Sequence, residues 1–315
     1  MIEIQHLTKR YGNKLAVKDA SFTIRKGEIL GFLGRNGAGK STTMNIITGY
    51  ISASSGSVKL DGYDILDNPR EVKRRIGYLP EQPPLYMDMT VNEYLRFVCA
   101  VKDVKKSMVS SHLGDITELI GLGEVRGRLI RNLSKGYRQR VGMAQALVGN
   151  PEVVILDEPT VGLDPMQITE VRRLIRELGK DHTIVLSSHI LPEVADVCDR
   201  LVIIHQGKIV AEDTLEHLTH SEADARKTRL RIEGPEEEIC EALTAIEGIR
   251  RVDRLGSREE NTFDFMLETD GETDVRRTVF SRMAEKGWPI LIQRPMDLEL
   301  EDVFLQLTGD SGEEA

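Results

Sequence analysis

The sequence predicts an α/β domain built on parallel strands, followed by a small α+β domain. The first observation is a pair of near-continuous apolar runs, residues 153–157 and 183–187, which are typical of parallel strands buried on both faces. The second is a glycine-rich stretch, residues 34–42, that lies between a strand pattern and a helix pattern. The third is a shift toward charged residues after residue 210, followed by alternating short strand and helix patterns. Together they predict two folding units in one chain.

Length and charge agree with this division and argue against one class of partner. A chain of 315 residues exceeds what one core usually holds. We therefore expect two domains, residues 1–220 and residues 221–315. The net charge is −9, and the densest basic run, Lys73-Arg74-Arg75, is more typical of a solvated helix face. We expect no nucleic acid as a partner, because its binding requires a concentrated basic surface.

Cysteine usage favours a reducing compartment, and hydropathy predicts no membrane-spanning helix. The three cysteines, Cys99, Cys198 and Cys240, are odd in number and far apart, which argues against a disulfide framework and a zinc site. No apolar run approaches the roughly 18 residues that a membrane-spanning helix needs, and the start lacks a signal-peptide pattern. Any role at a membrane is therefore expected to depend on a partner.

The glycine-rich stretch matches a phosphate-binding loop, G-x-x-x-x-G-K-[ST]. Glycines let backbone N–H groups approach phosphate oxygens, and a helix that begins here adds its positive N-terminal end. A buried strand is expected at 28–33 and a helix at 42–47, which is the required order. Lys40 is expected to contact the β- and γ-phosphates, and Ser41 to supply a hydroxyl for Mg²⁺. The expected nucleotide contacts are Gly34, Arg35, Asn36, Gly37, Ala38, Gly39, Lys40, Ser41 and Thr42.

Further patterns surround this loop. Residues 2–7 and 20–24 are predicted to form short strands with a turn at 11–14 between them, and residues 56–62 a third strand. From residue 91 to about residue 149 the apolar spacing becomes helical, as at Leu95, Val98 and Cys99. We therefore expect a helical segment before the strand at 153–157.

Two carboxylates end the buried strand at 153–157, where negative charge is unfavourable unless a ligand occupies it. Asp157 is expected to hold Mg²⁺, directly or through water. Glu158 is expected to act as the general base for an attacking water. The alternative is that both residues only cap the loop before Pro159. This Walker B pattern complements the phosphate loop.

Four further motifs lie in order along the chain: Gln82 after Leu79-Pro80-Glu81, Leu-Ser-Lys-Gly-Tyr-Arg-Gln at 133–139, Leu163-Asp164, and His189 after Ser187-Ser188. They resemble the Q-loop, signature, D-loop and switch histidine of the nucleotide-binding subunits of ABC transporters. The resemblance covers residues 1 to about 220. It implies a P-loop NTPase (ABC ATPase) domain that binds ATP and Mg²⁺.

The resemblance also implies roles for residues outside the phosphate loop. Tyr11 is placed like the family's adenine-stacking residue with Val17 beside it, although a tyrosine packed in a turn would give the same pattern. Gln82 is implied to reach Mg²⁺ or the attacking water, with a surface glutamine as the alternative. His189 is implied to hydrogen-bond the γ-phosphate and to hold the water and Glu158 in line.

The signature motif implies a second ATPase subunit. In the family this helix N-terminus points at the γ-phosphate held by the other subunit, so Ser134 and Gly136 imply a head-to-tail dimer with nucleotide between the chains. Ser134 also suits an N-cap for a helix that begins near Tyr137, which alone would account for it. The motif departs from the commonest Leu-Ser-Gly-Gly-Gln at Lys135 and Tyr137. The contacts of these two positions stay open.

Beyond residue 220 the patterns predict a ferredoxin-like domain. Strands at 229–233, 250–255, 262–268 and 289–293 and helices at 235–246 and 273–286 follow the order βαββαβ, in which helices cover one face of an antiparallel sheet. Residues 212–227 are expected to form a helix and a linker. An amphipathic helix is expected at 298–307, packed on its own domain or on a dimer partner, before a frayed acidic end from Gly309 to Ala315.

The function implied by these features is that of an ATP-hydrolysing subunit of an ABC transporter. It would pair with a second ATPase subunit, bind separate transmembrane permease subunits at the cytoplasmic face of the cell membrane, and power transport by closing on ATP. The run from Ser187 to Val194 and the closing helix at 298–307 are similar to those of ABC-2-type exporters, which often carry a C-terminal accessory domain. An exporter is therefore implied.

Three alternatives are weighed against this interpretation. Soluble ABC ATPases that act on ribosomes or DNA usually join two ATPase units or contain a coiled coil, whereas this chain has one uninterrupted unit. A non-hydrolysing subunit would normally lack Glu158 or His189. A GTPase would carry Asn-Lys-x-Asp, and Asn13-Lys14-Leu15-Ala16 lacks the aspartate. The sequence leaves open the cargo, the identity of the dimer partner and the role of the C-terminal domain.

Overall fold

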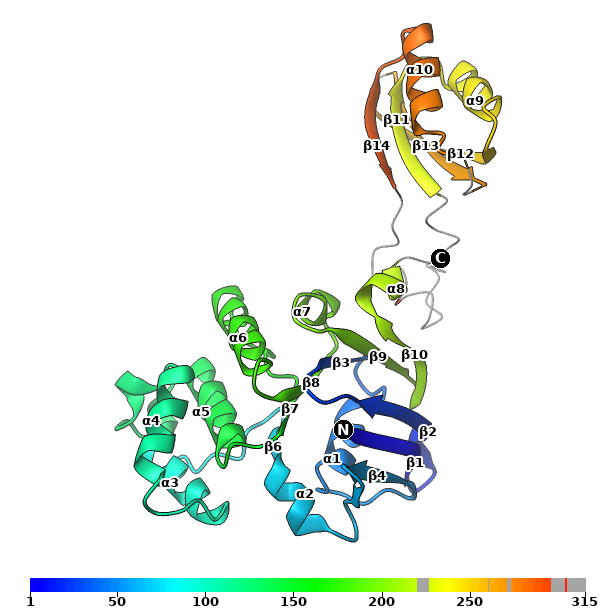
Figure 1. The fold of residues 1–315 in the computed structure, drawn as a ribbon. Coiled ribbons are helices and arrows are strands. Elements are labelled where there is room, and N and C mark those ends of the chain that lie inside the picture. The colour runs from blue at the N-terminus through cyan, green and yellow to red at the C-terminus, as the bar shows by residue number, and fades with distance from the viewer. Residues whose placement is uncertain (220–226, 260, 271–272, 296–303, 305–315) are drawn as a thin grey trace. The chain divides into compact units, whose positions relative to one another are not determined.

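The computed structural model describes residues 1–219, 227–259, 261–270, 273–295 and 304. The chain separates between Leu215 and Glu216 into two compact units. The first unit carries a mixed, mainly parallel sheet and a smaller antiparallel sheet, and the second carries one antiparallel sheet (Figure 1).

A six-stranded sheet forms the centre of the first unit. Its spatial order is β10 (Lys208–Thr214), β9 (Arg200–His205), β3 (Ile29–Leu33), β8 (Thr183–Ser188), β7 (Val153–Asp157) and β6 (Ile76–Leu79). All neighbours from β9 to β6 are parallel, and β10 pairs antiparallel with β9 at the edge. Every residue of β3, β7 and β8 is buried, which confirms the two-faced burial predicted for the apolar runs.

A second sheet covers part of this core. Its order is β2 (Lys14–Ile24), β1 (Ile2–Tyr11), β4 (Ser55–Leu60) and β5 (Tyr63–Asp64), all antiparallel. One hydrophobic cluster joins the two sheets and α1 (Lys40–Ile47), and it includes Ile4, Phe22, Met44, Val58 and Val185. Burial of this apolar surface holds the helix that follows the phosphate loop in place.

The helical segment expected from residue 91 to about residue 149 is present as α3 (Val91–Val101), α4 (Val109–Leu119) and α5 (Lys135–Leu147), which lie together in Figure 1. A capping box at Thr90 and Glu93 starts α3. Ser134 caps α5, because its Oγ accepts from Tyr137 N at 3.3 Å. The remaining helices of this unit are α2 (Pro69–Arg75), α6 (Pro165–Leu178) and α7 (Leu191–Ala195), with 3₁₀ turns at Gly123–Val125 and Ile130–Asn132.

The second unit has the predicted βαββαβ order: β11 (Lys227–Glu233), α9 (Glu236–Thr244), β12 (Ile249–Glu259), β13 (Thr262–Thr269), α10 (Arg276–Lys286) and β14 (Ile290–Pro295). The sheet order β12-β13-β11-β14 with antiparallel neighbours is ferredoxin-like. Leu230 and Phe265 from the sheet pack with Ile239 and Val279 from the two helices. On β13, Asp264 is buried and accepts from Arg229 and Arg231.

The segment between the units differs from expectation. Residues 212–214 complete strand β10, where a helix was expected, and α8 follows at Leu215–Thr219. The linker at 220–226 lies outside the described residues, as do the end from Gly309 to Ala315 and all of the helix expected at 298–307 except Phe304. No helix in the described part of the chain is long and apolar enough to cross a membrane.

Candidate nucleotide-binding site

Three neighbouring strands bring the predicted phosphate and catalytic motifs to one edge of the sheet. The loops after β3, β7 and β8 all leave the carboxyl ends of parallel strands, where α/β proteins place their ligands. Gly34 N donates to Ser188 O at 3.3 Å, and Glu158 N donates to Ser187 O at 3.2 Å. These bonds extend the sheet's ladder into the loops, so the three motifs share one rigid base.

The phosphate loop is shaped by glycine at its last turn. Gly39 has a φ of +115°, which is unfavourable for any side chain, and a Cβ there would lie 2.5 Å from Ala16 O. Directly after it, α1 begins at Lys40, so the free N–H groups of the first helical turn face the loop. Backbone donors and a helix N-terminus are thus gathered where a polyphosphate chain would lie.

A chain of charged contacts crosses the site. Lys40 Nζ lies 3.1 Å from Glu158 Oε1, and His189 Nδ1 lies 2.8 Å from Glu158 Oε2. Lys40 Nζ also donates to Gly34 O at 2.6 Å. Lys40 and Glu158 are each 5% exposed, so their charges interact with little screening by water. Glu158 has a φ of 49°, which is uncommon for a side-chain-bearing residue and is typical of functional positions.

Oxygen ligands suited to Mg²⁺ lie beside this chain of contacts. Asp157 is buried and accepts hydrogen bonds from the hydroxyls of Ser187 and Ser41. Burial raises the pKa of Asp157, and the two hydroxyls oppose the shift. No group of three or more histidine, cysteine or acidic side chains is arranged as a metal site among the described residues. One buried carboxylate beside a hydroxyl fits a cation that completes its shell with phosphate oxygens and water, as Mg²⁺ does.

A cavity of about 610 Å³ is lined by most of the predicted site residues. Tyr11, 49% exposed, stands on its wall together with Ala16 and Lys14. The predicted residues that line it are Tyr11, Asn36, Gly37, Gly39, Lys40, Ser41, Thr42, Glu158 and His189. Positions expected to contact the base and the phosphates or to act in catalysis thus lie along one cavity, whereas Gly34, Arg35, Ala38 and Asp157 are not among its lining residues.

Val17 does not lie where it was expected. Its side chain is fully buried in the hydrophobic core, and the preceding residue, Ala16, lines the cavity. The reason is the alternation of side chains along β2, which turns neighbouring residues to opposite faces. Ala16 is thus the residue that accompanies Tyr11.

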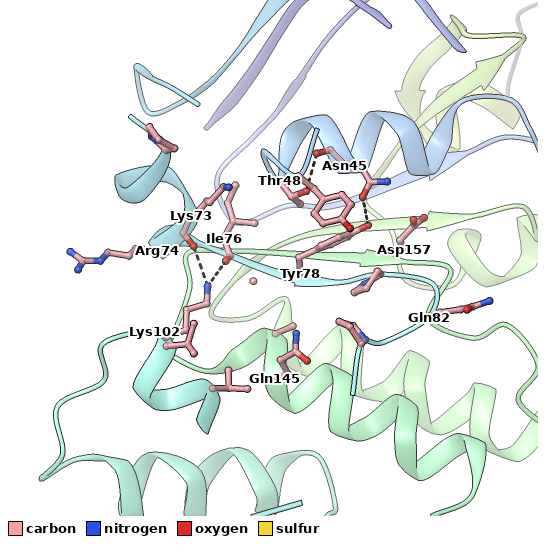
Figure 2. Close-up of a pocket in the computed structure, with 18 of the residues that line it drawn as sticks. Asn45, Thr48, Lys73, Arg74, Ile76, Tyr78, Gln82, Lys102, Gln145 and Asp157 are labelled. Carbon is pink, nitrogen blue, oxygen red and sulfur yellow. Dashed lines mark hydrogen bonds between the residues drawn. The ribbon is translucent and has the colours of Figure 1, made fainter. Parts of the chain in front are cut away.

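Glu81 lines the nucleotide cavity, whereas its neighbour Gln82 lines only the larger cavity shown in Figure 2. Ser41 and Glu81 line both cavities, whereas Asp157, the residue expected to hold Mg²⁺, lines only the larger one. The contact of Gln82 with Mg²⁺ or water stays a prediction, and Glu81 is the residue of this loop that lines the nucleotide cavity. The sequence signal for Glu81 was its position directly beside Gln82, in the loop after a buried strand.

The signature residues stand apart from this cavity. Ser134 and Gly136 open α5 and are absent from the cavity's lining. A Cβ on Gly136 would lie 2.7 Å from the side-chain amide of Gln167 in α6. The side chain of Lys135 lies against Gly162, in the loop before α6. The signature segment is therefore packed on the D-loop region of its own chain.

A phosphate loop that opens a helix, a buried Walker B aspartate and a glutamate held by lysine and histidine together define a P-loop ATPase. The family model for ABC transporter matches residues 17–161. The bacitracin transport ATP-binding protein BcrA of Bacillus licheniformis is 40% identical over 220 residues, which cover 69% of this chain and 71% of that protein. The chain belongs to the family of ABC transporter ATP-binding proteins, and it is an ATP-binding subunit with an ATPase domain.

Some relatives extend through the C-terminal unit. The linearmycin resistance ATP-binding protein LnrL of Bacillus subtilis (strain 168) is 30% identical over 310 residues and covers 98% of both chains. Among solved structures, the ATP binding subunit of an ABC transporter superposes with a TM-score of 0.64 at 32% identity, over 69% of this chain and 91% of that one. The dimeric ABC transporter cassette MJ0796 gives 0.63 at 25% identity, over 68% of this chain and 99% of that one. The structural likeness is thus to the ATPase domain.

Proposed function

We propose that this chain powers an exporter of the ABC-2 type from the cytoplasmic face of the membrane. The observation that carries the hydrolytic part is the contact chain from Lys40 through Glu158 to His189, with distances of 3.1 and 2.8 Å. In this proposal Lys40 holds the β- and γ-phosphates, Glu158 accepts a proton from the attacking water, and His189 orients Glu158 and the γ-phosphate. Export is supported by relatives named for bacitracin transport and linearmycin resistance.

Metal binding in this proposal falls to Ser41, Asp157 and the loop after β6. When bound, Mg²⁺ would neutralise charge that develops on the β- and γ-phosphates. Glu81 is the residue of that loop that faces the nucleotide cavity, so we assign to it the contact first expected of Gln82. Gln82 lines the larger cavity and is given no metal contact in this proposal.

The position of the signature segment supports pairing of two ATPase subunits. Ser134 is exposed and Gly136 lies at the first turn of a 13-residue helix, yet neither lines the chain's own nucleotide cavity. In a head-to-tail pair these residues would meet the γ-phosphate held by the partner, as the relative solved as a dimeric cassette supports. ATP would then join the two chains, and its hydrolysis would release them.

The larger cavity, of about 1180 Å³, is the surface we assign to a transmembrane partner. Figure 2 shows it between residues of α1 and β6 on one side and of α5 on the other, with Lys73, Arg74 and Lys102 at one end. Tyr50 and Phe97, 76% and 41% exposed, line it as well. Asp103 also lines the cavity and pairs with Arg74 at 2.8 Å. Exposed aromatic residues with a rim in which cations outnumber this carboxylate suit an amphipathic cytoplasmic segment that carries acidic residues.

The C-terminal unit is assigned here to the accessory domain that ABC-2-type ATPases carry. The support is its ferredoxin-like sheet order and the match of LnrL over nearly the whole chain. In this proposal the unit occurs with the exporter branch and takes no part in hydrolysis, because the predicted site residues all lie before residue 190.

The test of this function combines hydrolysis with location in the cell. Purified full-length chain is expected to release phosphate from ATP, Lys40→Ala to abolish release, and the exposed-surface variant Glu177→Ala to behave as wild type. Sedimentation of native cell extracts is expected to place the chain with the membranes, together with a separate membrane protein captured by cross-linking. Sedimentation with ribosomes and absence from membranes would overturn the exporter and support the soluble ATPase. Absence of hydrolysis by wild type would overturn the catalytic proposal.

A further inference from the structure

A buried carboxylate outside the hydrolytic contacts lies directly behind the catalytic loops. Glu193, in α7, is 4% exposed. No lysine, arginine or histidine lies within ion-pair distance of it among the residues that the structure describes. Burying a carboxylate without a cation is costly, so its hydrogen bonds must contribute strongly to holding it.

The partners of Glu193 are two hydroxyls on two different catalytic loops. Thr160 Oγ1 donates to Glu193 Oε2 at 2.5 Å, and Ser188 Oγ donates to the same oxygen at 3.1 Å. Thr160 follows Glu158 by two residues, and Ser188 immediately precedes His189. One carboxylate oxygen therefore joins the loop of the general base to the loop of the switch histidine.

Each hydroxyl is itself fixed. Thr160 and Ser188 are 5% and 0% exposed, so water does not compete for these bonds. Ser188 Oγ also accepts from Ile190 N at 3.0 Å, which folds the chain around His189. Glu193 N donates to Ile190 O at 3.2 Å, which places the start of α7 against the same turn. Glu193 is thus connected by hydrogen bonds to Ser188 and Ile190, the residues on either side of His189.

We propose that Glu193 is a positioning residue that holds Glu158 and His189 in register, while it touches neither nucleotide nor water. The side chains of Glu158 and His189 contact each other directly at 2.8 Å. The Glu193 oxygen makes a second link between the same two loops, through Thr160 and Ser188. Two links between the same loops restrict their relative movement, and misplacement by about 1 Å can cost about 100-fold in rate. This inference rests on the proposed roles of Glu158 and His189.

The choice of variants follows from the shared oxygen. Glu193→Gln retains one carboxamide oxygen, which can take both hydroxyl bonds, whereas Glu193→Ala removes the acceptor. We expect Glu193→Ala to lower kcat about 10- to 100-fold, and Glu193→Gln to restore it to within about three-fold of wild type. The Kd for ATP is expected to stay within about two-fold in both, because the phosphate loop is untouched. The exposed Glu177→Ala serves as a matched control and is expected to keep wild-type kcat and Kd.

The measurements are steady-state phosphate release and ATP titration on the full-length chain. Unchanged kcat in Glu193→Ala, equal losses in Glu193→Ala and Glu193→Gln, or a loss of ATP binding that matches the loss of kcat would each overturn the proposal. Should Glu193→Ala fail to fold, Thr160→Val and Ser188→Ala each remove one of the two hydrogen bonds to Glu193. Wild-type kcat in both variants would overturn the proposal. Lack of hydrolysis by wild type with ATP still bound would instead refute the proposed function.

Discussion

Replacing Glu158 by glutamine removes the negative charge between Lys40 and His189 and keeps the size of the side chain. The two carboxylate oxygens each have one partner, Lys40 Nζ at 3.1 Å and His189 Nδ1 at 2.8 Å. Because the two donors contact different oxygens and a carboxamide replaces one of these by NH₂, one donor loses its acceptor, and the carboxamide cannot take a proton from water. Loss of a general base slows a reaction about 100- to 10,000-fold. This corresponds to about 3–5 kcal/mol in the barrier.

The assay for this variant is phosphate release from ATP by the full-length chain, with ATP affinity measured separately by titration. Glu158→Gln is expected to bind ATP with an affinity at least equal to wild type, since the loop from Gly34 to Thr42 is unchanged. Glu177→Gln, a charge change on the exposed face of α6, is the matched control and is expected to hydrolyse at the wild-type rate. A rate for Glu158→Gln within about three-fold of wild type would refute the assignment of the general base.

Four further variants test the surroundings of the site and the second unit. Glu81→Ala is expected to raise the Mg²⁺ concentration for half-maximal hydrolysis several-fold and Gln82→Ala to leave it unchanged; equal effects would contradict the assignment of Glu81. Asp264→Asn is expected to cost about 1–2 kcal/mol of unfolding free energy at pH 7, because hydrogen bonds from two arginines lower the pKa of Asp264 from 3.8 to about 2. That stabilisation is complete above pH 4 and is lost as the pH falls toward 2, so an undiminished difference in urea unfolding at pH 2 would contradict it. Lys102→Met is expected to lower the unfolding free energy by about 1–3 kcal/mol, since two backbone carbonyls lose their donor, and an unchanged urea midpoint would refute this.

The fold and the phosphate site were predictable because their signals are local. Buried parallel strands show as continuous apolar runs, and the loop from Gly34 to Thr42 encodes its own backbone turn and helix start. The strand from residue 208 to residue 214 was not predicted, and a helix was expected from residue 212, because it is a charged edge strand. Its partner β9 determines its conformation, and no sequence periodicity reports that pairing.

At two points the residue that lines the nucleotide cavity is the sequence neighbour of the predicted one, and each difference has a physical cause. Ala16 and Val17 are both apolar, so composition does not tell which of the two faces the cavity. Glu81 and Gln82 lie in a loop, where no repeat orders the side chains. Glu193 was overlooked because glutamate is usually exposed, and its two hydroxyl partners come from other loops. Such positions depend on tertiary contacts.

The measurement that tests the central claim most directly is the ATP dependence of self-association in Glu158→Gln. Sedimentation of the full-length variant is expected to show dimers when ATP and Mg²⁺ are present, with one ATP retained per chain, and monomers without nucleotide. Adding Ser134→Arg, which places bulk and charge at the start of α5, is expected to prevent pairing and leave ATP binding intact. A chain that binds ATP and stays monomeric at all concentrations would contradict an ATPase that works by closing on its partner.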